Sequence, residues 1–152
     1  MISDLSIYEI EKLHLATSVR SFRTPDLAAF VKAVLDADTD EAKQLYNRIK
    51  DKYPLVITRD LNTAKDWVRG NCQGTTRYGL LSSSGALRLK PEGIFVKNEI
   101  SVANWFLNDK DDVRSSYMLE DVVTEFDIQG LELDYSIVAW DADFRYDGTQ
   151  RY

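Results

Sequence analysis

Cysteine and histidine are almost absent from this 152-residue sequence, which contains one of each, Cys72 and His14. An intramolecular disulfide needs two cysteines, and structural zinc is usually held by four cysteine or histidine ligands. The same scarcity argues against a catalytic triad built on histidine. We therefore expect no disulfide, no metal site and no histidine-dependent catalysis. A single free thiol suits a reducing cytoplasm.

Long apolar runs are also missing. A membrane-spanning helix needs about 18 or more consecutive apolar residues, and no segment approaches that length. The N-terminal stretch MISDLSIYEIEK lacks the basic start and the apolar core of a secretory signal. These absences predict a soluble, cytoplasmic protein with no membrane partner.

Positive charge is in deficit, with 19 Lys and Arg against 25 Asp and Glu and a formal net charge of −6. Binding of nucleic acid through phosphates depends on clustered Lys and Arg. A surface that coats nucleic acid is therefore not expected, although a local basic strip is compatible with this balance. The simpler interpretation is that the acidic surface keeps the domain soluble.

Apolar patterning alternates between strands and helices along the chain. Strands are predicted over 13–19, 55–58, 78–81, 122–126 and 135–140, helices after Thr24, after DADTD (36–40), after Asn62 or Thr63 and after Ser101, and one helical turn over 129–132. Such alternation is typical of βαβ units and a mostly parallel sheet. Trp67 and Trp105 fall within apolar helical stripes, which favours core positions over base-stacking ones. The sequence predicts one α/β domain spanning 1–152.

No nucleotide-binding P-loop is present. The pattern G-x-x-x-x-G-K-[ST], whose backbone amides cradle nucleotide phosphates, occurs nowhere in the sequence. We therefore expect that this chain alone does not hydrolyse ATP.

The segment TEFDIQGLE places Thr124, Phe126, Gln129, Gly130 and Glu132 at the offsets of a known motif. It resembles motif V of superfamily 1 helicases, with Phe126 in place of the usual histidine. The stretches SVRSF, VITRDL, RYGLLSSSGALRL and WFLN resemble an uncharacterised bacterial family of helicase-like P-loop ATPases. That family is distantly similar to the helicase-like C-terminal part of Schlafen proteins. The resemblance covers most of the chain.

The resemblance implies a three-layer RecA-like fold of the P-loop NTPase type. The chain would be the second RecA-like domain of a helicase-like ATPase and a fragment of a longer protein, because the family's C-terminal arginine motif is not found. Its implied partners are a P-loop-bearing N-terminal domain of the same protein and single-stranded DNA or RNA. ATP with Mg²⁺ would be bound by the full-length parent rather than by this chain.

Arg20 in SVRSF matches the arginine of motif IV, which in such helicases reaches the γ-phosphate and stabilises charge that develops during phosphoryl transfer. The match is partial, since Ser18 and Val19 occupy the family's asparagine and tyrosine positions. The alternative is a surface arginine paired with a carboxylate, and Arg23 is a nearby competitor.

Three motif V residues are implied to contact the nucleotide. Glu132 could accept hydrogen bonds from ribose hydroxyls, or it could instead cap a helix or pair with an arginine. Gln129 could signal the nucleotide state between the two halves. Gly130 is expected to serve backbone geometry, because a tight turn favours a residue without Cβ.

Nucleic acid is expected at the loops that follow strands, where hydroxyls and backbone amides suit phosphates. The candidates are Thr124, Ser82, Ser83, Thr58 and Arg59, with Ser84, Arg88 and Arg114 near them in the sequence. The alternatives are a plain turn for the serines and an ordinary β-branched strand residue for Thr124.

Two functions remain open at this point. The first is the second RecA-like domain of an ATP-dependent nucleic-acid motor. The alternative is a non-catalytic α/β binding or interaction module with a degenerate nucleotide site, which the acidic charge and the absent P-loop favour. An independent enzyme lacks a recognisable catalytic constellation.

Overall fold

The computed structural model of the chain describes residues 25–142, which fall into two compact units, 25–55 and 56–142. The expected strand 13–19 and its Arg20, and the expected cap Thr24, lie outside the described residues. Among residues 25–142, no helix has the length and apolar character needed to cross a bilayer.

The first unit is a pair of helices, α1 (Pro25–Leu35) and α2 (Thr39–Ile49). Proline occupies the first position of α1, where its missing N–H is not needed. The Asp38 side chain caps α2 by accepting a hydrogen bond from the Glu41 amide at 3.0 Å. Phe30 and Tyr46 pack with ring centroids 6.1 Å apart. Both helices form where the apolar spacing predicts them.

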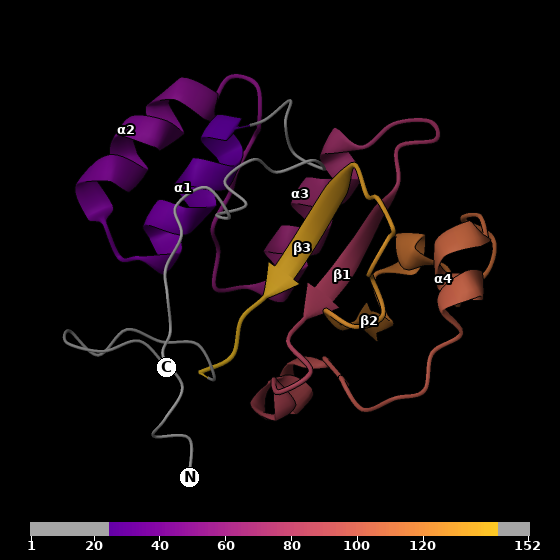
Figure 1. Cartoon of the computed structure of the whole chain (residues 1–152). Coiled ribbons are helices and arrows are strands. Elements are labelled where there is room, and N and C mark those ends of the chain that lie inside the picture. Colours follow the sequence, from indigo (N-terminus) through magenta and orange to yellow (C-terminus); the bar gives the residue numbers. More distant parts are fainter. Residues whose placement is uncertain (1–24, 143–152) are drawn as a thin grey trace, which may run out of the picture. The chain divides into compact units, whose positions relative to one another are not determined.

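The second unit contains a three-stranded, all-parallel sheet in the order β2 (Val122–Val123), β1 (Tyr78–Ser82), β3 (Tyr135–Ala139). Leu80 at the centre of β1 pairs with Val122 on one side and Ile137 on the other. The arrangement is visible in Figure 1. The prediction of an α/β chain with parallel strands is confirmed at this level.

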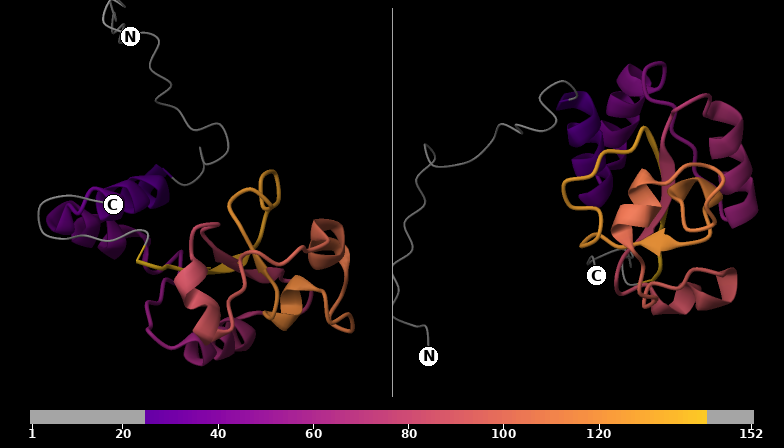
Figure 2. Two further views of the ribbon diagram at one scale, coloured as in Figure 1. Left: turned by 90° about the horizontal axis from the view of Figure 1, so that it is seen from below. Right: turned by 90° about the vertical axis from the view of Figure 1, so that its right-hand side faces the viewer.

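Helix α3 (Leu61–Asn71) packs on one face of the sheet (Figures 1 and 2). Leu80 is 1% exposed in the core beneath it, and Val68 of α3 is 3% exposed. Trp67 packs against this core and meets Tyr135 edge-on at 6.0 Å between ring centroids, as its helical spacing predicts. The expected cap at Asn62 or Thr63 is wrong. The helix begins earlier, and the Asp60 carboxylate accepts the Thr63 amide hydrogen.

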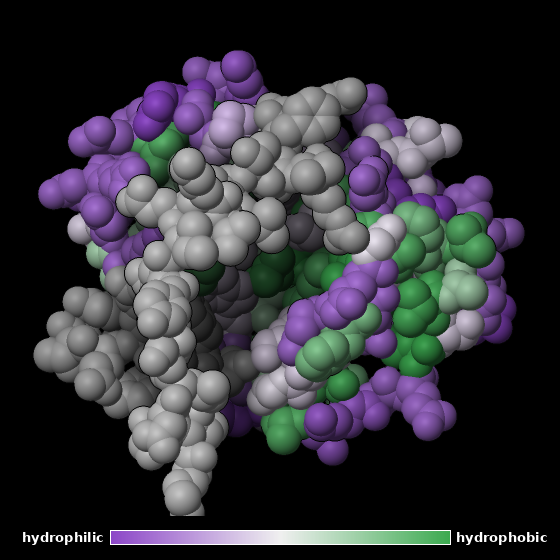
Figure 3. Space-filling model, viewed as in Figure 1, coloured by the Kyte–Doolittle hydropathy of each residue, from purple (hydrophilic) through white to green (hydrophobic). Residues whose placement is uncertain are grey.

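The opposite face carries Trp105 of α4 (Val102–Leu107), which is fully buried over Gly79 of β1. The Trp105 indole N–H donates to the Asp121 carbonyl at 3.2 Å, and Ser101 caps α4 as the sequence predicts. Two short 3-10 helices, η2 (Leu87–Glu92) and η3 (Ser116–Met118), complete this unit. Phe126, Val138 and Trp140 remain more than half exposed, and the space-filling view shows apolar surface on this unit (Figure 3).

Two expected elements are wrong. Residues 55–58 form no strand, and Ile57 is 96% exposed. No strand of the described residues pairs with this segment, and an apolar run alone does not distinguish a buried strand from an exposed link. The expected helical turn over 129–132 is also absent. A turn over 125–130 is followed by irregular chain up to β3.

Candidate functional site

The carboxyl ends of the three parallel strands meet at one edge of the sheet (Figure 1). We call this the carboxyl-end edge and define it by three segments, 82–88 after β1, 124–130 after β2, and 140–142 after β3. Ligands of open α/β sheets bind outside this end of the strands. The sequence-based candidates Ser82, Ser83 and Thr124 all lie here.

Ser82 and Ser83 play different parts at this edge. Ser82 is 3% exposed, and its hydroxyl donates to the Ala139 carbonyl at 2.9 Å, which ties the end of β1 to the end of β3. Ser83 is half-buried, and its Oγ accepts the Gly85 amide hydrogen at 3.1 Å. Because that contact uses a lone pair, the Ser83 hydroxyl hydrogen stays available for an incoming acceptor.

Ser84 is held by a carboxylate from the neighbouring strand end. The backbone N–H and the hydroxyl of Ser84 each donate to one oxygen of Glu125, both at 2.8 Å. The hydroxyl and then the amide lower the pKa of the Glu125 carboxyl below its usual range, because both stabilise the charged form. This contact joins the segments after β1 and β2 and was not foreseen from the sequence.

Thr124 is engaged in the same way within its own turn. Both its amide and its hydroxyl donate to the Asp127 carboxylate, at 2.8 and 2.7 Å, and Thr124 is 7% exposed. After β3, the carboxylate of Asp141 accepts the Arg88 amide hydrogen at 3.1 Å and lies 3.6 Å from its Nε. Three carboxylates therefore occupy backbone donors along the carboxyl-end edge.

Thr58 and Arg59 lie just before α3, and both are exposed. Thr58 Oγ1 accepts the Asp60 amide hydrogen at 3.1 Å. The Arg59 guanidinium forms no hydrogen bond or ion pair with the residues that the structure describes. Asp60 caps α3, and hydrogen bonds from Thr63, first from its amide and then from its side chain, lower the pKa of the Asp60 carboxyl. Within residues 25–142, Arg59 is therefore an unpaired cation beside the capped start of α3.

The residues beyond Thr124 that the sequence analysis assigned to motif V lie in the turn over 125–130 and in the chain from there to β3. Gly130 adopts a left-handed φ of +87°, and nothing lies within 4 Å of where its Cβ would be. The prediction that Gly130 serves backbone geometry is confirmed. Gln129 and Glu132 are exposed, and their side chains form no hydrogen bond or ion pair with residues 25–142. After the turn over 125–130, the chain runs through 131–134 to the start of β3 (Figure 1).

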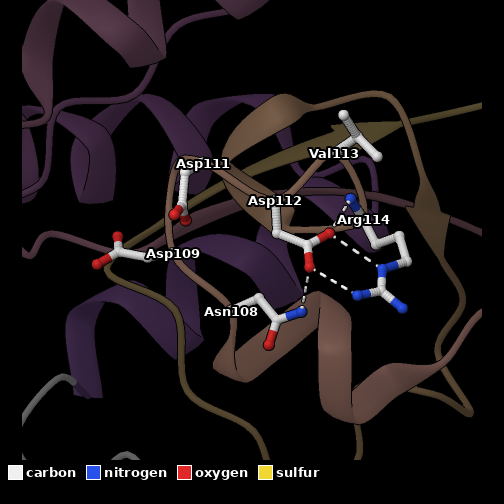
Figure 4. Close-up of a pocket in the computed structure, with 6 residues that line it drawn as sticks. All are labelled: Asn108, Asp109, Asp111, Asp112, Val113 and Arg114. Atoms are coloured by element: carbon white, nitrogen blue, oxygen red, sulfur yellow. Dashed lines mark hydrogen bonds and ion pairs between the residues drawn. The ribbon is translucent and has the colours of Figure 1, made fainter.

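A depression of about 510 Å³ lies elsewhere, in the loop after α4 (Figure 4). Asp112 anchors it by accepting hydrogen bonds from Arg114 Nε and Nη2 at 3.0 and 2.7 Å and from Asn108 at 2.7 Å. The Arg114 guanidinium and amide hold the pKa of Asp112 far below its usual range. Ser115 and Ser116, which follow Arg114, are buried. Arg114 is paired with Asp112, so its guanidinium is not a free cation for phosphate.

A resident metal is not supported within the described part of the chain. No group of three or more His, Cys, Asp or Glu side chains there is arranged to hold a metal ion. The carboxylates Glu125, Asp127 and Asp141 are each committed to hydrogen-bond donors instead.

A small parallel sheet with helices packed on it and loops gathered at the strand ends is the architecture of α/β ligand-binding proteins. Over residues 1–152 the chain matches the family model described as Schlafen group 3, DNA/RNA helicase domain, and it belongs to this family. Searches of curated proteins and of solved structures found no significant match. The predicted helicase-like relation is confirmed, and the domain is of the helicase-like nucleic-acid motor class.

Proposed function

We propose that this chain is the second RecA-like domain of an ATP-dependent nucleic-acid motor with a three-layer RecA-like fold. In this proposal Arg20, Gln129, Gly130 and Glu132 complete an ATP site that is shared with a P-loop-bearing N-terminal domain of the same protein. Single-stranded DNA or RNA contacts the carboxyl-end edge and the start of α3. The protein works in the cytoplasm.

The chain belongs to a helicase family. Within it, the conformation and exposure of residues 129–132 are the observation that carries the proposal. Gly130 makes a left-handed turn that a β-carbon would strain, while Gln129 and Glu132 are exposed and unengaged by the described residues. An exposed polar pair beside a specially shaped turn is what a ligand arriving from another domain requires.

The chemistry assigned to each residue follows from its charge and donors. Bound ATP would supply the phosphoryl group, and Mg²⁺ would be held by the P-loop half. The Glu132 carboxylate can accept both ribose hydroxyl hydrogens, and Gln129 can donate or accept according to the nucleotide state. The Arg20 guanidinium would stabilise the charge on the transferred phosphoryl group.

The nucleic-acid contacts divide into direct and supporting ones. Arg59 and the Thr58 and Ser83 hydroxyls are available to phosphate oxygens. Ser82 and Thr124 donate their hydroxyl hydrogens internally, so we assign them to the shape of the strand-end loops. Few free cations at this edge imply few neutralised phosphates and a shallow dependence of affinity on salt.

The test is ATP turnover by the full-length parent, with and without single-stranded DNA or RNA. Arg20→Ala is expected to lower turnover by roughly a thousandfold while leaving ATP binding nearly unchanged. Glu132→Ala is expected to weaken ATP binding by roughly tenfold, the worth of a hydrogen bond to a charged group. Glu99→Ala removes the same charge at another exposed position and serves as the control.

Normal turnover by Arg20→Ala would remove Arg20 from the site. A parent with no turnover under any nucleic-acid condition would instead favour a non-catalytic α/β interaction module. The acidic groups that occupy the donors of the carboxyl-end edge are the observation in favour of that second function.

A further inference from the structure

Ser84 presents a pair of hydrogen-bond donors that already binds an anionic group. Its N–H and O–H converge on the two oxygens of the Glu125 carboxylate at 2.8 Å each. Phosphate oxygens have the same charge sign and the same preference for backbone N–H and hydroxyl donors. Gly85 follows Ser84 and is exposed, so no side chain at that position blocks the approach of a ligand.

Glu125 differs from the other two carboxylates at this edge. Asp127 is half-buried and holds its own turn, and the side chain of Asp141 is 6% exposed. Glu125 is exposed, it comes from the opposite segment, and its carboxylate accepts the Ser84 amide and hydroxyl hydrogens. It can swing into solvent without leaving a buried group unpaired, which the other two cannot do.

We propose that the amide and hydroxyl of Ser84 form a phosphate-binding site and that the Glu125 carboxylate occupies it until a phosphate of the nucleic-acid strand displaces it. The Ser84 site and its internal competitor follow from the hydrogen bonds themselves. Only the assignment of the phosphate to nucleic acid rests on the proposed function. Occupancy of the site by nucleic acid would release the turn over 125–130 from the segment after β1.

The protonation state of Glu125 agrees with such competition. The pKa of its carboxyl is lowered by the Ser84 donors, so the group is ionised at neutral pH. An ionised carboxylate both fills the donors and repels a second anion. Phosphate must therefore overcome an occupied site and a like charge, and removal of Glu125 relieves both.

The expected size of the effect follows from the occupied fraction. If Glu125 closes the site nine-tenths of the time, its removal raises phosphate affinity about tenfold, because apparent affinity scales with the competent fraction. General repulsion by a single exposed charge contributes less at physiological salt. Glu99→Ala loses an equal charge at an exposed position and measures that general term.

The experiment follows the Ser84 backbone amide by NMR in the 152-residue chain during titration with inorganic phosphate. We expect Glu125→Ala to bind phosphate roughly threefold to tenfold more tightly than Glu99→Ala, with the Ser84 amide among the shifted signals. Adding Ser84→Ala to Glu125→Ala should abolish the gain. Glu125→Gln, which keeps the side-chain length and one acceptor, should give an intermediate affinity and guards against misfolding of the alanine variant.

Equal affinities for Glu125→Ala and Glu99→Ala, or a Ser84 amide that does not respond, would overturn the proposal. Separate titrations with a single-stranded oligonucleotide and with ATP identify the source of the phosphate. A Ser84 response to the oligonucleotide supports the nucleic-acid assignment, and a response to ATP alone refutes it. Because no step requires ATP turnover, loss of the motor function and loss of the Ser84 site are distinguishable.

Discussion

Gly79→Ala is a single-methyl change that tests how closely α4 packs on the sheet. Gly79 lies in the central strand β1, and a Cβ there would meet Cη2 and Cζ2 of Trp105 at 2.5 Å and Cδ1 of Leu133 at 3.3 Å. Trp105 is fully buried, and its indole N–H is fixed on the Asp121 carbonyl. The ring therefore has little freedom to move, and either it or the strand must shift.

The expected cost is the difference of two terms. Overpacking a well-filled site costs about 1–3 kcal/mol. Replacing glycine restricts the unfolded chain, which returns about 0.4–1 kcal/mol where the native backbone accepts alanine. Gly79 is outside the left-handed region, so the second term applies. The net expectation is a loss of about 1–2 kcal/mol in the free energy of unfolding.

Urea unfolding, followed by tryptophan fluorescence and circular dichroism, measures this loss. The control is Gly70→Ala in α3, where nothing lies within 4 Å of the added methyl group. There we expect a gain of about 0.5–1 kcal/mol from helix propensity. In a Trp105→Phe background, which removes the second ring, the Gly79→Ala penalty should shrink by about 1 kcal/mol. A Gly79→Ala variant as stable as Gly70→Ala would refute the packing argument.

Two further predictions concern the turn after β2 and the single thiol. Gly130→Ala should lower the free energy of unfolding by about 1–2 kcal/mol, because only the left-handed backbone opposes the methyl group. Gly130→Asn should cost less, and equal stability of wild type and Gly130→Ala in urea would contradict the turn geometry. Burial, and then the charge of Asp134, raise the pKa of the Cys72 thiol in the folded chain. The protonated thiol therefore contributes to stability below the pKa of the unfolded chain, and this contribution is lost as the pH rises through the pKa of the folded chain. We therefore expect iodoacetamide to alkylate Cys72 more slowly at pH 8 in the native chain than in urea, and a faster native reaction would contradict this.

Local patterns were sufficient to predict most elements of the fold. The spacing of apolar residues located α1, α2 and α3, and the Ser101 cap located α4. The alternation of strands and helices predicted a mostly parallel sheet, and β1 pairs in parallel with both β2 and β3. Residues 55–58 were misassigned because four apolar or β-branched residues look alike in a buried strand and in an exposed link. Only the presence of a pairing strand distinguishes the two.

The candidate site was less predictable, because its contacts join segments that follow different strands and lie far apart in the sequence. Ser84 and Glu125 are 41 positions apart, and Arg88 and Asp141 are 53 apart. The strand order β2–β1–β3 brings the members of each pair together. The sequence alone does not give the order of the strands, so it does not show which carboxylate meets which donor. A weak signal was present, since Glu125 and Asp141 each lie within three residues of the end of a strand. The role of Gly130 was predictable, because backbone geometry is a local property.

The distribution of charge at the carboxyl-end edge reconciles an acidic chain with a nucleic-acid motor family. A static nucleic-acid surface would display free donors and cations, whereas here the amides of Ser84, Thr124 and Arg88 are covered by carboxylates. A motor must release its strand in every cycle, and donors that are shared with an internal acceptor bind phosphate weakly. The exposed Glu125 carboxylate can leave its hydrogen-bond donors for solvent, whereas the buried Asp141 carboxylate cannot. That difference confines exchange to Ser84, while Asp141 keeps the end of β3 joined to the segment after β1.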